Sequence, residues 1–374
     1  MLDDISQAVL SRDEVVRYLK GTHGESAGAA RERVYAYLEE LRTTQRYTLY
    51  RALKHPLFPI LRKIKRHVEH IEQAIAATAS GRVIYASDHK SHTDYLIEPL
   101  ILDDHGVRPP IIAAGINLFG GPLGLLHRHI TGAVPIRRNT KDPAYLITLK
   151  AYVAELLGAH DLLFYIEGGR SYSGELKSPK TGLIHAAMQS DTANLVILPM
   201  AVSYDLVLED RILARQGVKH RQRPFAREVA EMMRSAVGYR SRAFVTFGTP
   251  IPTSEYNAQS KSDVLELAHR TLEAIGLLYK VTPAALVAAA MRPSIAHADL
   301  EGRIDVMLDR LRERKANLAV ESGRQAVAEG IRLLEGRGVL VVEPDRVRVR
   351  NRMLLRYYAH TLDHLFAPPL SPAP

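Results

Sequence analysis

Short apolar runs alternate with stretches of helical pattern between about residues 80 and 255. The stretches at 92–102 and 142–158 are typical of helices. The apolar runs, which are typical of buried strands, cover residues 82–86, 111–114, 132–136, 162–166, 195–204 and 243–248. This alternation predicts an α/β fold with a central mixed sheet flanked by helices.

Helical patterns predominate on both sides of this region. Residues 2–79 are predicted to form helices, and the pattern becomes helical again from residue 260. Thr282 followed by Pro283 is a favourable helix start, because a capping residue precedes proline at the first helical position. We therefore expect three parts: an N-terminal helical region, an α/β core and a C-terminal helical extension, at residues 1–79, 80–258 and 259–374.

The C-terminal extension ends in a different pattern. Residues 338–350 form an apolar run and a run of alternating arginine and valine around Pro344-Asp345, which predicts a hairpin. A final helix is expected from Arg352. Helices followed by a hairpin and a helix predict a winged-helix-like extension.

Composition narrows the function classes. The chain has 374 residues, enough for two domains, with 46% hydrophobic and 24% charged residues as in globular proteins. It has no cysteine, which excludes disulfides, a thiolate nucleophile and cysteine-based metal sites. The acidic start at Met1–Asp4 precedes no apolar signal-peptide core, and this favours the cytoplasm.

One uncharged segment, Pro109–Leu126, has the nominal length of a membrane-crossing helix. Its prolines, glycines and Asn117 would leave backbone groups without hydrogen bonds in lipid. We therefore expect a buried strand, a glycine turn and a short helix instead.

The net charge of +9 indicates an acidic partner, such as nucleic acid, an anionic lipid surface or a phosphorylated substrate. Residues 51–67 interleave basic and large apolar side chains. If the stretch is helical, one face carries Leu57, Ile60, Leu61, Ile64 and Val68. Such a helix either lies in a membrane interface or packs on the core, and the sequence leaves both open.

The most informative motif follows the run at 82–86, where His89 and Asp94 are five positions apart at the expected strand-to-helix turn. A carboxylate hydrogen-bonded to imidazole fixes its tautomer and makes it a general base. The alternative is structural, because Ser91 and Asp94 have the spacing of a helix capping box.

Three further blocks follow in order. They are Gly132–Arg138, Phe164–Ser171 with the nearby Pro179–Leu183, and Val196–Tyr204. Together with the His89 motif, they resemble the four blocks of the glycerolipid acyltransferases, including the bacterial glycerol-3-phosphate and dihydroxyacetone-phosphate acyltransferases. A weaker resemblance continues at residues 281–287 and 355–358.

The resemblance implies transfer of a fatty acyl group from acyl-CoA or acyl carrier protein to glycerol 3-phosphate, with lysophosphatidate or dihydroxyacetone phosphate as alternative acceptors. His89 would be the general base and Asp94 its orienting partner. Arg137, Arg138 and Arg170 are expected to converge on one phosphate near His89, because guanidinium groups bind phosphate oxygens bidentately. Glu167 would anchor an arginine or accept from a glycerol hydroxyl. The other expected acceptor-site residues are Gly168, Gly169, Ser171 and Lys180.

The chain departs from the family pattern at Val134-Pro135, where aromatic residues are common, and at Tyr172, where many members have arginine. These departures bear on the acceptor more than on the reaction. We expect no metal and no cofactor beyond the acyl thioester co-substrate. We also expect peripheral contact with the anionic inner face of the cell membrane and no nucleic-acid partner. The alternatives of another class are a basic winged-helix nucleic-acid-binding protein and an inactive membrane-surface adaptor.

Overall fold

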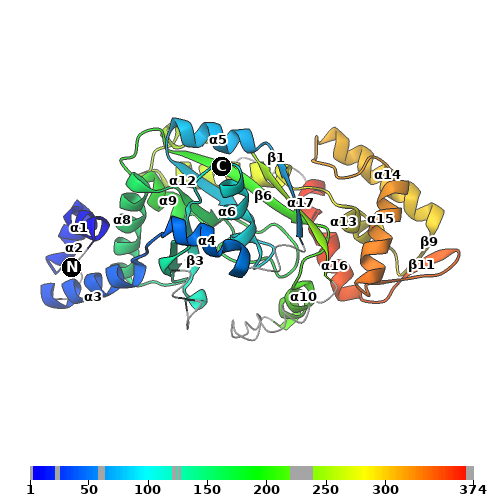
Figure 1. Ribbon diagram of the computed structural model, residues 1–374, viewed down its shortest axis with the longest axis horizontal. Coiled ribbons are helices and arrows are strands. Elements are labelled where there is room, and N and C mark those ends of the chain that lie inside the picture. The colour runs from blue at the N-terminus through cyan, green and yellow to red at the C-terminus, as the bar shows by residue number, and fades with distance from the viewer. Residues whose placement is uncertain are drawn as a thin grey trace.

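The computed structural model describes residues 3–21, 26–57, 64–119, 124, 128–219 and 239–367. An eight-stranded mixed sheet lies at its centre, with α1–α3 at one end and the C-terminal helices at the other (Figure 1). Seven strands follow the order β1-β7-β6-β2-β5-β3-β4, and β8 pairs with β6. The predicted α/β class is confirmed.

Each of the six predicted runs forms a strand of this sheet. The strands are β1 (Ile64–Glu69), β2 (Val83–Ser87), β3 (Ile111–Gly115), β4 (Ala133–Ile136), β5 (Leu162–Tyr165), β6 (Val196–Tyr204), β7 (Ser241–Phe247) and β8 (Ile251–Pro252). All neighbouring pairs are parallel except β6–β7 and β6–β8. β2 is central and wholly buried, as its uninterrupted apolar sequence predicts.

β1 corrects the expectation that residues 2–79 are all helical. α4 (Tyr47–Leu57) is followed by a strand that pairs in parallel with β7 at the sheet edge. Ile64 and Val68 are four positions apart, a spacing that fits both a helix and one face of a strand. The expected amphipathic helix over 51–67 is therefore wrong at 64–67. Residues 58–63 and the side chains of 53–57 lie outside the described part of the chain.

Helices cover both faces of the sheet, so alternate residues of β2 enter two different cores. Tyr85 packs in one core with Ile97 and Leu100 of α6 (Asp94–Asp104). Ile84 packs in the other with residues of α3 and α8, such as Val34. The remaining helices of this half are α1 (Asp4–Ser11), α2 (Asp13–Leu19), α3 (Ala27–Leu41), α5 (Ile71–Ser80), α8 (Pro143–Ala159), α9 (Gly182–Met188), α10 (Asp210–Lys219) and α12 (Lys261–Leu278), with short 3-10 turns at Ile116–Leu118 and Thr253–Glu255.

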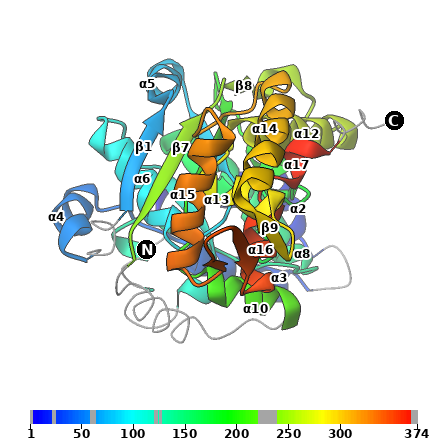
Figure 2. The same cartoon turned by 90° about the vertical axis from the view of Figure 1, so that its right-hand side faces the viewer.

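The C-terminal region combines helices with a small three-stranded sheet, seen from the front in Figure 2. As predicted, a hairpin surrounds residues 344–345, a helix begins at Arg352, and Thr282 caps a helix that starts with Pro283. The elements are α13 (Pro283–Ala290), β9 (Ser294–Ala296), α14 (His297–Glu313), α15 (Gly323–Gly336), β10 (Leu340–Val342), β11 (Arg346–Val349), α16 (Arg352–His360) and α17 (Asp363–Phe366).

The uncharged segment at 109–126 begins with a strand, β3, as expected. The glycine turn and short helix predicted after it fall mostly on residues outside the described ranges. Within those ranges, none of the helices has both the length and the apolar character needed to cross a membrane.

Candidate functional site

Three loops meet at one edge of the sheet because the strands that precede them run parallel. β5 and β6 flank β2, so their carboxyl ends lie beside the carboxyl end of β2. The loops that follow these strands are residues 88–93, 166–171 and 205–210, and we call them the His89 site. Open α/β sheets usually bind ligands at this edge.

His89 and Asp94 form the predicted pair. Nδ1 of His89 lies 2.9 Å from Oδ2 of Asp94, which begins α6. The same Oδ2 accepts hydrogen bonds from the backbone N–H groups of Lys90 and Ser91, at 2.8 and 2.9 Å. Oδ1 accepts from the Tyr204 hydroxyl at 2.6 Å. Asp94 thus bonds the Ser91 amide, as the capping alternative requires, and also orients the imidazole.

These bonds define the protonation state of His89. An ionised carboxylate only accepts hydrogen bonds, so Nδ1 of His89 carries the proton and Nε2 presents a lone pair. Burial, followed by the positive charges of Arg170 and Arg138, lowers the pKa of His89 well below its ordinary value. Burial raises the pKa of Asp94 to about 6, which leaves it ionised at neutral pH. The imidazole is therefore neutral at pH 7, and its Nε2 lone pair is able to accept a proton.

A buried group behind His89 supports the ring. The Tyr165 ring stacks on the imidazole, with centroids 3.8 Å apart and planes 9° from parallel. The Tyr165 hydroxyl lies 2.9 Å from Glu98, whose other oxygen lies 2.6 Å from the Ser87 hydroxyl. Burial raises the pKa of Glu98 well above its ordinary value. Sequence reasoning missed this group, although a glutamate within the apolar sequence of α6 was a usable signal.

The loop after β5 is held by its own polar residues. Glu167 accepts hydrogen bonds from the backbone N–H groups of His89 and Lys177, at 3.2 and 3.0 Å. Glu167 thus holds the backbone on two sides, and its expected contact with an arginine or with a glycerol hydroxyl stays a prediction. Ser171 also has partners within the protein. Its backbone N–H donates to the His89 carbonyl, and its hydroxyl donates to the Glu175 carbonyl. Glu167 and Ser171 therefore hold the backbone N–H and carbonyl of His89.

The two adjacent arginines point to different partners, so the predicted convergence is wrong for Arg137. Its guanidinium binds both carboxylate oxygens of Glu40 on α3, at 2.7 and 2.5 Å, and lies over the Tyr37 ring. Arg137 directly follows β4, whereas the backbone bends at Arg138 and Asn139, and the two side chains separate at this bend.

Arg138 is the arginine that faces the loop after β5. Its guanidinium packs against Gly169 and against Gly115 at the end of β3, and a Cβ at either glycine would come within 3.1 Å of a guanidinium nitrogen. The side chain is exposed, and it makes no hydrogen bond or ion pair within the described ranges. Partial burial of the guanidinium between these two glycines lowers the pKa of Arg138 without removing its charge. An accessible cation without a partner is suited to an anionic ligand.

Other cations surround the same loop. Arg170 is buried, with Nη1 3.7 Å from Oε1 of Glu209. Lys180 is exposed, and its stem lies against Gly168, whose φ of +69° favours glycine. Tyr172, which stands where the family resemblance leads us to expect arginine, lies under Arg170, and its ring centroid is 5.3 Å from the ammonium of Lys177.

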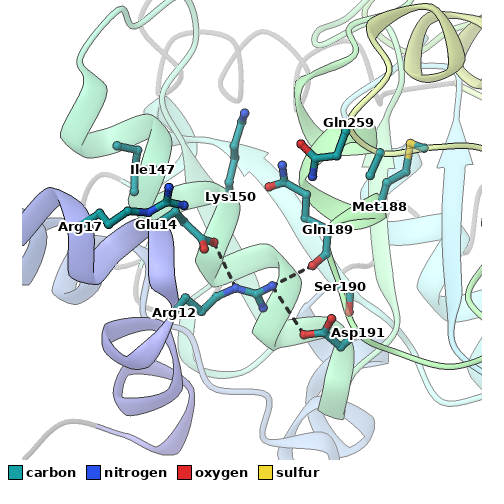
Figure 3. Close-up of a pocket in the computed structure, with 11 residues that line it drawn as sticks. Arg12, Glu14, Arg17, Ile147, Lys150, Met188, Gln189, Ser190, Asp191 and Gln259 are labelled. Carbon is teal, nitrogen blue, oxygen red and sulfur yellow. Dashed lines mark hydrogen bonds and ion pairs between the residues drawn. The ribbon is translucent and has the colours of Figure 1, made fainter.

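A second group of basic residues lines a pocket of about 480 Å³ between α2, α8 and the end of α9, which we call the Arg12 pocket (Figure 3). Arg12 forms ion pairs with Glu155 at 2.6 Å and Glu14 at 3.1 Å, and donates to the Gln189 carbonyl. The pocket has no histidine–carboxylate pair among its lining residues, so it does not fit the predicted chemistry.

One cluster in the described ranges brings a histidine and two carboxylates together. Ligand atoms of Glu175, His360 and Asp363 lie within 4.8 Å of one another, and both carboxylates are exposed. His360 lies 3.4 Å from Glu175, so an ion pair explains their approach and we assign no ion.

Two family models match in tandem: Acyltransferase at residues 62–203 and Glycerol-3-phosphate acyltransferase C-terminal region at 228–370. Similar curated proteins are named glycerol-3-phosphate acyltransferase. The one from Aeromonas hydrophila subsp. hydrophila is 27% identical over 92% of this chain and 47% of its own length. The one from Pseudomonas syringae pv. syringae is 28% identical, over 91% and 45%.

The relative from Actinobacillus succinogenes is 33% identical over 61% of this chain and 29% of its own length. The chain spans about half the length of the first two relatives, so the comparison covers only part of each. The matches nevertheless run through both halves of this chain, from the sheet and its loops to the C-terminal helices. The chain belongs to the glycerolipid acyltransferase family.

Proposed function

We propose that the protein transfers a fatty acyl group from the thioester of acyl-CoA or acyl carrier protein to the hydroxyl of glycerol 3-phosphate. The main support is a neutral imidazole, oriented by Asp94, beside the guanidinium of Arg138, which has no acidic partner among the described residues. The names of the relatives support this acceptor.

In the proposed reaction, Nε2 of His89 takes the hydroxyl proton as the acceptor oxygen attacks the thioester carbonyl carbon. The carbon–sulfur bond then breaks, and the leaving thiolate takes the proton from His89. An ester and a free thiol result, and the imidazole returns to its starting state. The acceptor supplies the nucleophile, so the enzyme needs no serine or cysteine for this role.

Arg138 is the proposed primary contact for the acceptor phosphate, with Lys180 and Arg170 nearby. A guanidinium binds phosphate through two parallel hydrogen bonds and so fixes its orientation. A phosphate held there would direct the free hydroxyl towards His89, converting binding energy into orientation. Arg137 is not part of this proposal, because Glu40 neutralises its charge.

The nucleic-acid alternative is less well supported. Two of the three arginines at 338–350 have acidic neighbours: Arg346 lies 3.4 Å from Asp345, and Arg348 lies 3.0 Å from Glu343. A hairpin with most of its positive charges neutralised internally has less attraction for a phosphate backbone.

Peripheral contact with an anionic membrane stays a prediction. It rests on the basic-apolar stretch at 51–67 and on the lipid product, and the side chains of 53–63 lie outside the described residues. Flotation with anionic vesicles should recover the protein at low salt and lose it as salt rises. No recovery at low salt would contradict the prediction.

An acyl-transfer assay tests the function directly. Release of free thiol from palmitoyl-CoA or palmitoyl carrier protein should depend on glycerol 3-phosphate and yield an equal amount of the lysophosphatidic ester by mass spectrometry. Dihydroxyacetone phosphate and lysophosphatidate, assayed in parallel, separate the alternative acceptors. Thiol release that is independent of all three acceptors would contradict the proposal and indicate a hydrolase.

A further inference from the structure

The third loop of the His89 site connects the site with the C-terminal region. Residues 205–210 join β6 to α10, and all six are buried. Neither the sequence motifs nor the family resemblance assigns a role to Glu209, which is 1% exposed within this loop.

Glu209 faces the loop that carries His89. Its Oε2 accepts a hydrogen bond from the Ser91 hydroxyl at 2.8 Å, and Oε1 accepts from the His92 backbone N–H at 2.5 Å. Oε1 also lies 3.7 Å from Arg170. A buried carboxylate with these partners fixes the loop between His89 and Asp94.

A chain of hydroxyl groups continues from Glu209 to Asp94. The Ser91 hydroxyl lies 2.8 Å from that of Thr93, which lies 3.0 Å from that of Tyr204. The Tyr204 hydroxyl donates to Asp94 at 2.6 Å. Ser91 also donates its backbone N–H to Asp94. Thr93 has one hydroxyl hydrogen, which it donates either to Ser91 or to Tyr204, so the direct link from Ser91 to Asp94 is the backbone N–H of Ser91.

The C-terminal region holds the opposite side of the same loop. Arg337, just after α15, binds both oxygens of Asp210, at 2.5 and 2.8 Å, and donates to the Leu208 carbonyl at 2.9 Å. The Tyr358 hydroxyl on α16 donates to Asp210 at 2.6 Å and accepts from the Val207 N–H at 3.2 Å. Arg337 and Tyr358 thus hold the backbone on both sides of Glu209.

We infer that Glu209 is a positioning residue for the His89–Asp94 pair and that Arg337 and Tyr358 of the C-terminal region act through it. The inference rests on the proposed function, because it assumes that His89 is the base. The C-terminal region then affects catalysis indirectly. It holds the loop that carries Glu209, and Glu209 holds the loop that carries His89.

A double-mutant cycle on the full chain tests this inference, because residues that act through one another have non-additive effects. Glu209→Ala should lower kcat by about tenfold to a hundredfold, as expected for losing hydrogen bonds to a buried charged group. Arg337→Met should lower kcat by roughly tenfold. In the Glu209→Ala background, Arg337→Met should change kcat by less than about twofold, because its intermediary is already lost.

Arg242 provides a matched control. It also links the loop to the C-terminal region, through ion pairs with Asp205 and with Glu329 of α15, but it has no bond to Glu209 or Asp210. Arg242→Met should lower the melting temperature while changing kcat by less than about twofold in both backgrounds.

Arg337→Met with wild-type kcat, or independent multiplicative effects in the cycle, would overturn the inference. If Arg337→Met does not fold, Tyr358→Phe replaces it in the same cycle. His89→Ala, measured in parallel, distinguishes failure of the proposed function from failure of the positioning role of Glu209. An active His89→Ala would refute the proposed function, whereas an inactive one beside additive Arg337 and Glu209 effects would refute only the positioning role.

Discussion

The His89 site and the Arg12 pocket both bring arginine and lysine side chains together, but Arg12 and Arg138 differ in how their charges are paired. At the pocket, Arg12 is bound by Glu14 and Glu155. Beside the His89 site, Arg138 is exposed and has no acidic partner within the described ranges. A paired cation stabilises the fold, whereas an unpaired accessible cation retains its charge for a ligand.

The same contrast occurs between two adjacent residues. Arg137 and Arg138 have equal charge and both follow β4, yet Glu40 holds only Arg137. The difference lies in the direction of the side chain rather than in the residue type. The pairing of a cation therefore distinguishes two arginines that a basic motif alone treats alike.

The largest expected effect is that of His89→Ala. Loss of the general base should lower kcat by about 10²–10⁴ with little change in melting temperature. His185→Ala is the matched control, because His185 contacts Lys150 at the Arg12 pocket and should leave kcat unchanged. Equal kcat values for both variants and the wild type would remove the functional distinction between the two regions.

Asp94→Asn should have the next largest effect. An asparagine amide can donate to Nδ1 of His89, which would move the imidazole proton to Nε2 and remove the base. We expect kcat to fall by roughly 10²–10³.

Tyr204→Phe removes one of the four hydrogen-bond donors to Asp94 and should lower kcat by about tenfold. Activity measured with saturating acceptor distinguishes these effects from binding, and a fully active Asp94→Asn would contradict the assigned tautomer.

A pair of arginine variants sharpens the comparison. Arg138→Ala should weaken acceptor binding by about 1.5–3 kcal/mol, or roughly tenfold to 150-fold in the Michaelis constant for glycerol 3-phosphate. Arg137→Ala should change that constant by less than about threefold. Steady-state kinetics with each substrate varied in turn measures both. A larger effect of Arg137→Ala, or an effect of Arg138→Ala on the thioester alone, would show that the phosphate site is misplaced.

The pH dependence should move in a defined direction. A lowered pKa means that His89 loses its proton at a lower pH, so the base persists below pH 6.5. The acid limb of kcat/KM should therefore lie below 6.5, with the His89–Asp94 pair titrating together. Arg138→Gln removes a positive charge that disfavours imidazolium, so its acid limb should shift to higher pH. A wild-type limb above 6.5 would contradict the burial argument.

The sequence predicted the sheet well because its buried strands form uninterrupted apolar runs. β1 was missed because it lies at the sheet edge, where Ile64 and Val68 satisfy strand and helix spacing alike. His89 and Asp94 were found because both lie within one short motif. Glu209 was not, because it approaches Ser91 only through the parallel pairing of β2 and β6. Arg137 was misassigned because its partner Glu40 is distant in sequence.

The smallest expected effect on catalysis is that of Arg12→Met, and it tests the other side of the comparison. The substitution retains much of the aliphatic stem but removes the charge shared with Glu14 and Glu155 and the bond to the Gln189 carbonyl. Because these contacts join α2 to α8 and to the end of α9, the variant should lose about 1–3 kcal/mol of unfolding free energy. The melting temperature should fall by a few degrees.

The Michaelis constants and kcat should stay within about twofold of wild type, because the charge of Arg12 is neutralised by its carboxylate partners and is not expected to bind a substrate. Thermal denaturation and steady-state kinetics on one preparation measure both. A raised Michaelis constant for either substrate, with an unchanged melting temperature, would show that the pocket binds substrate despite its paired charges.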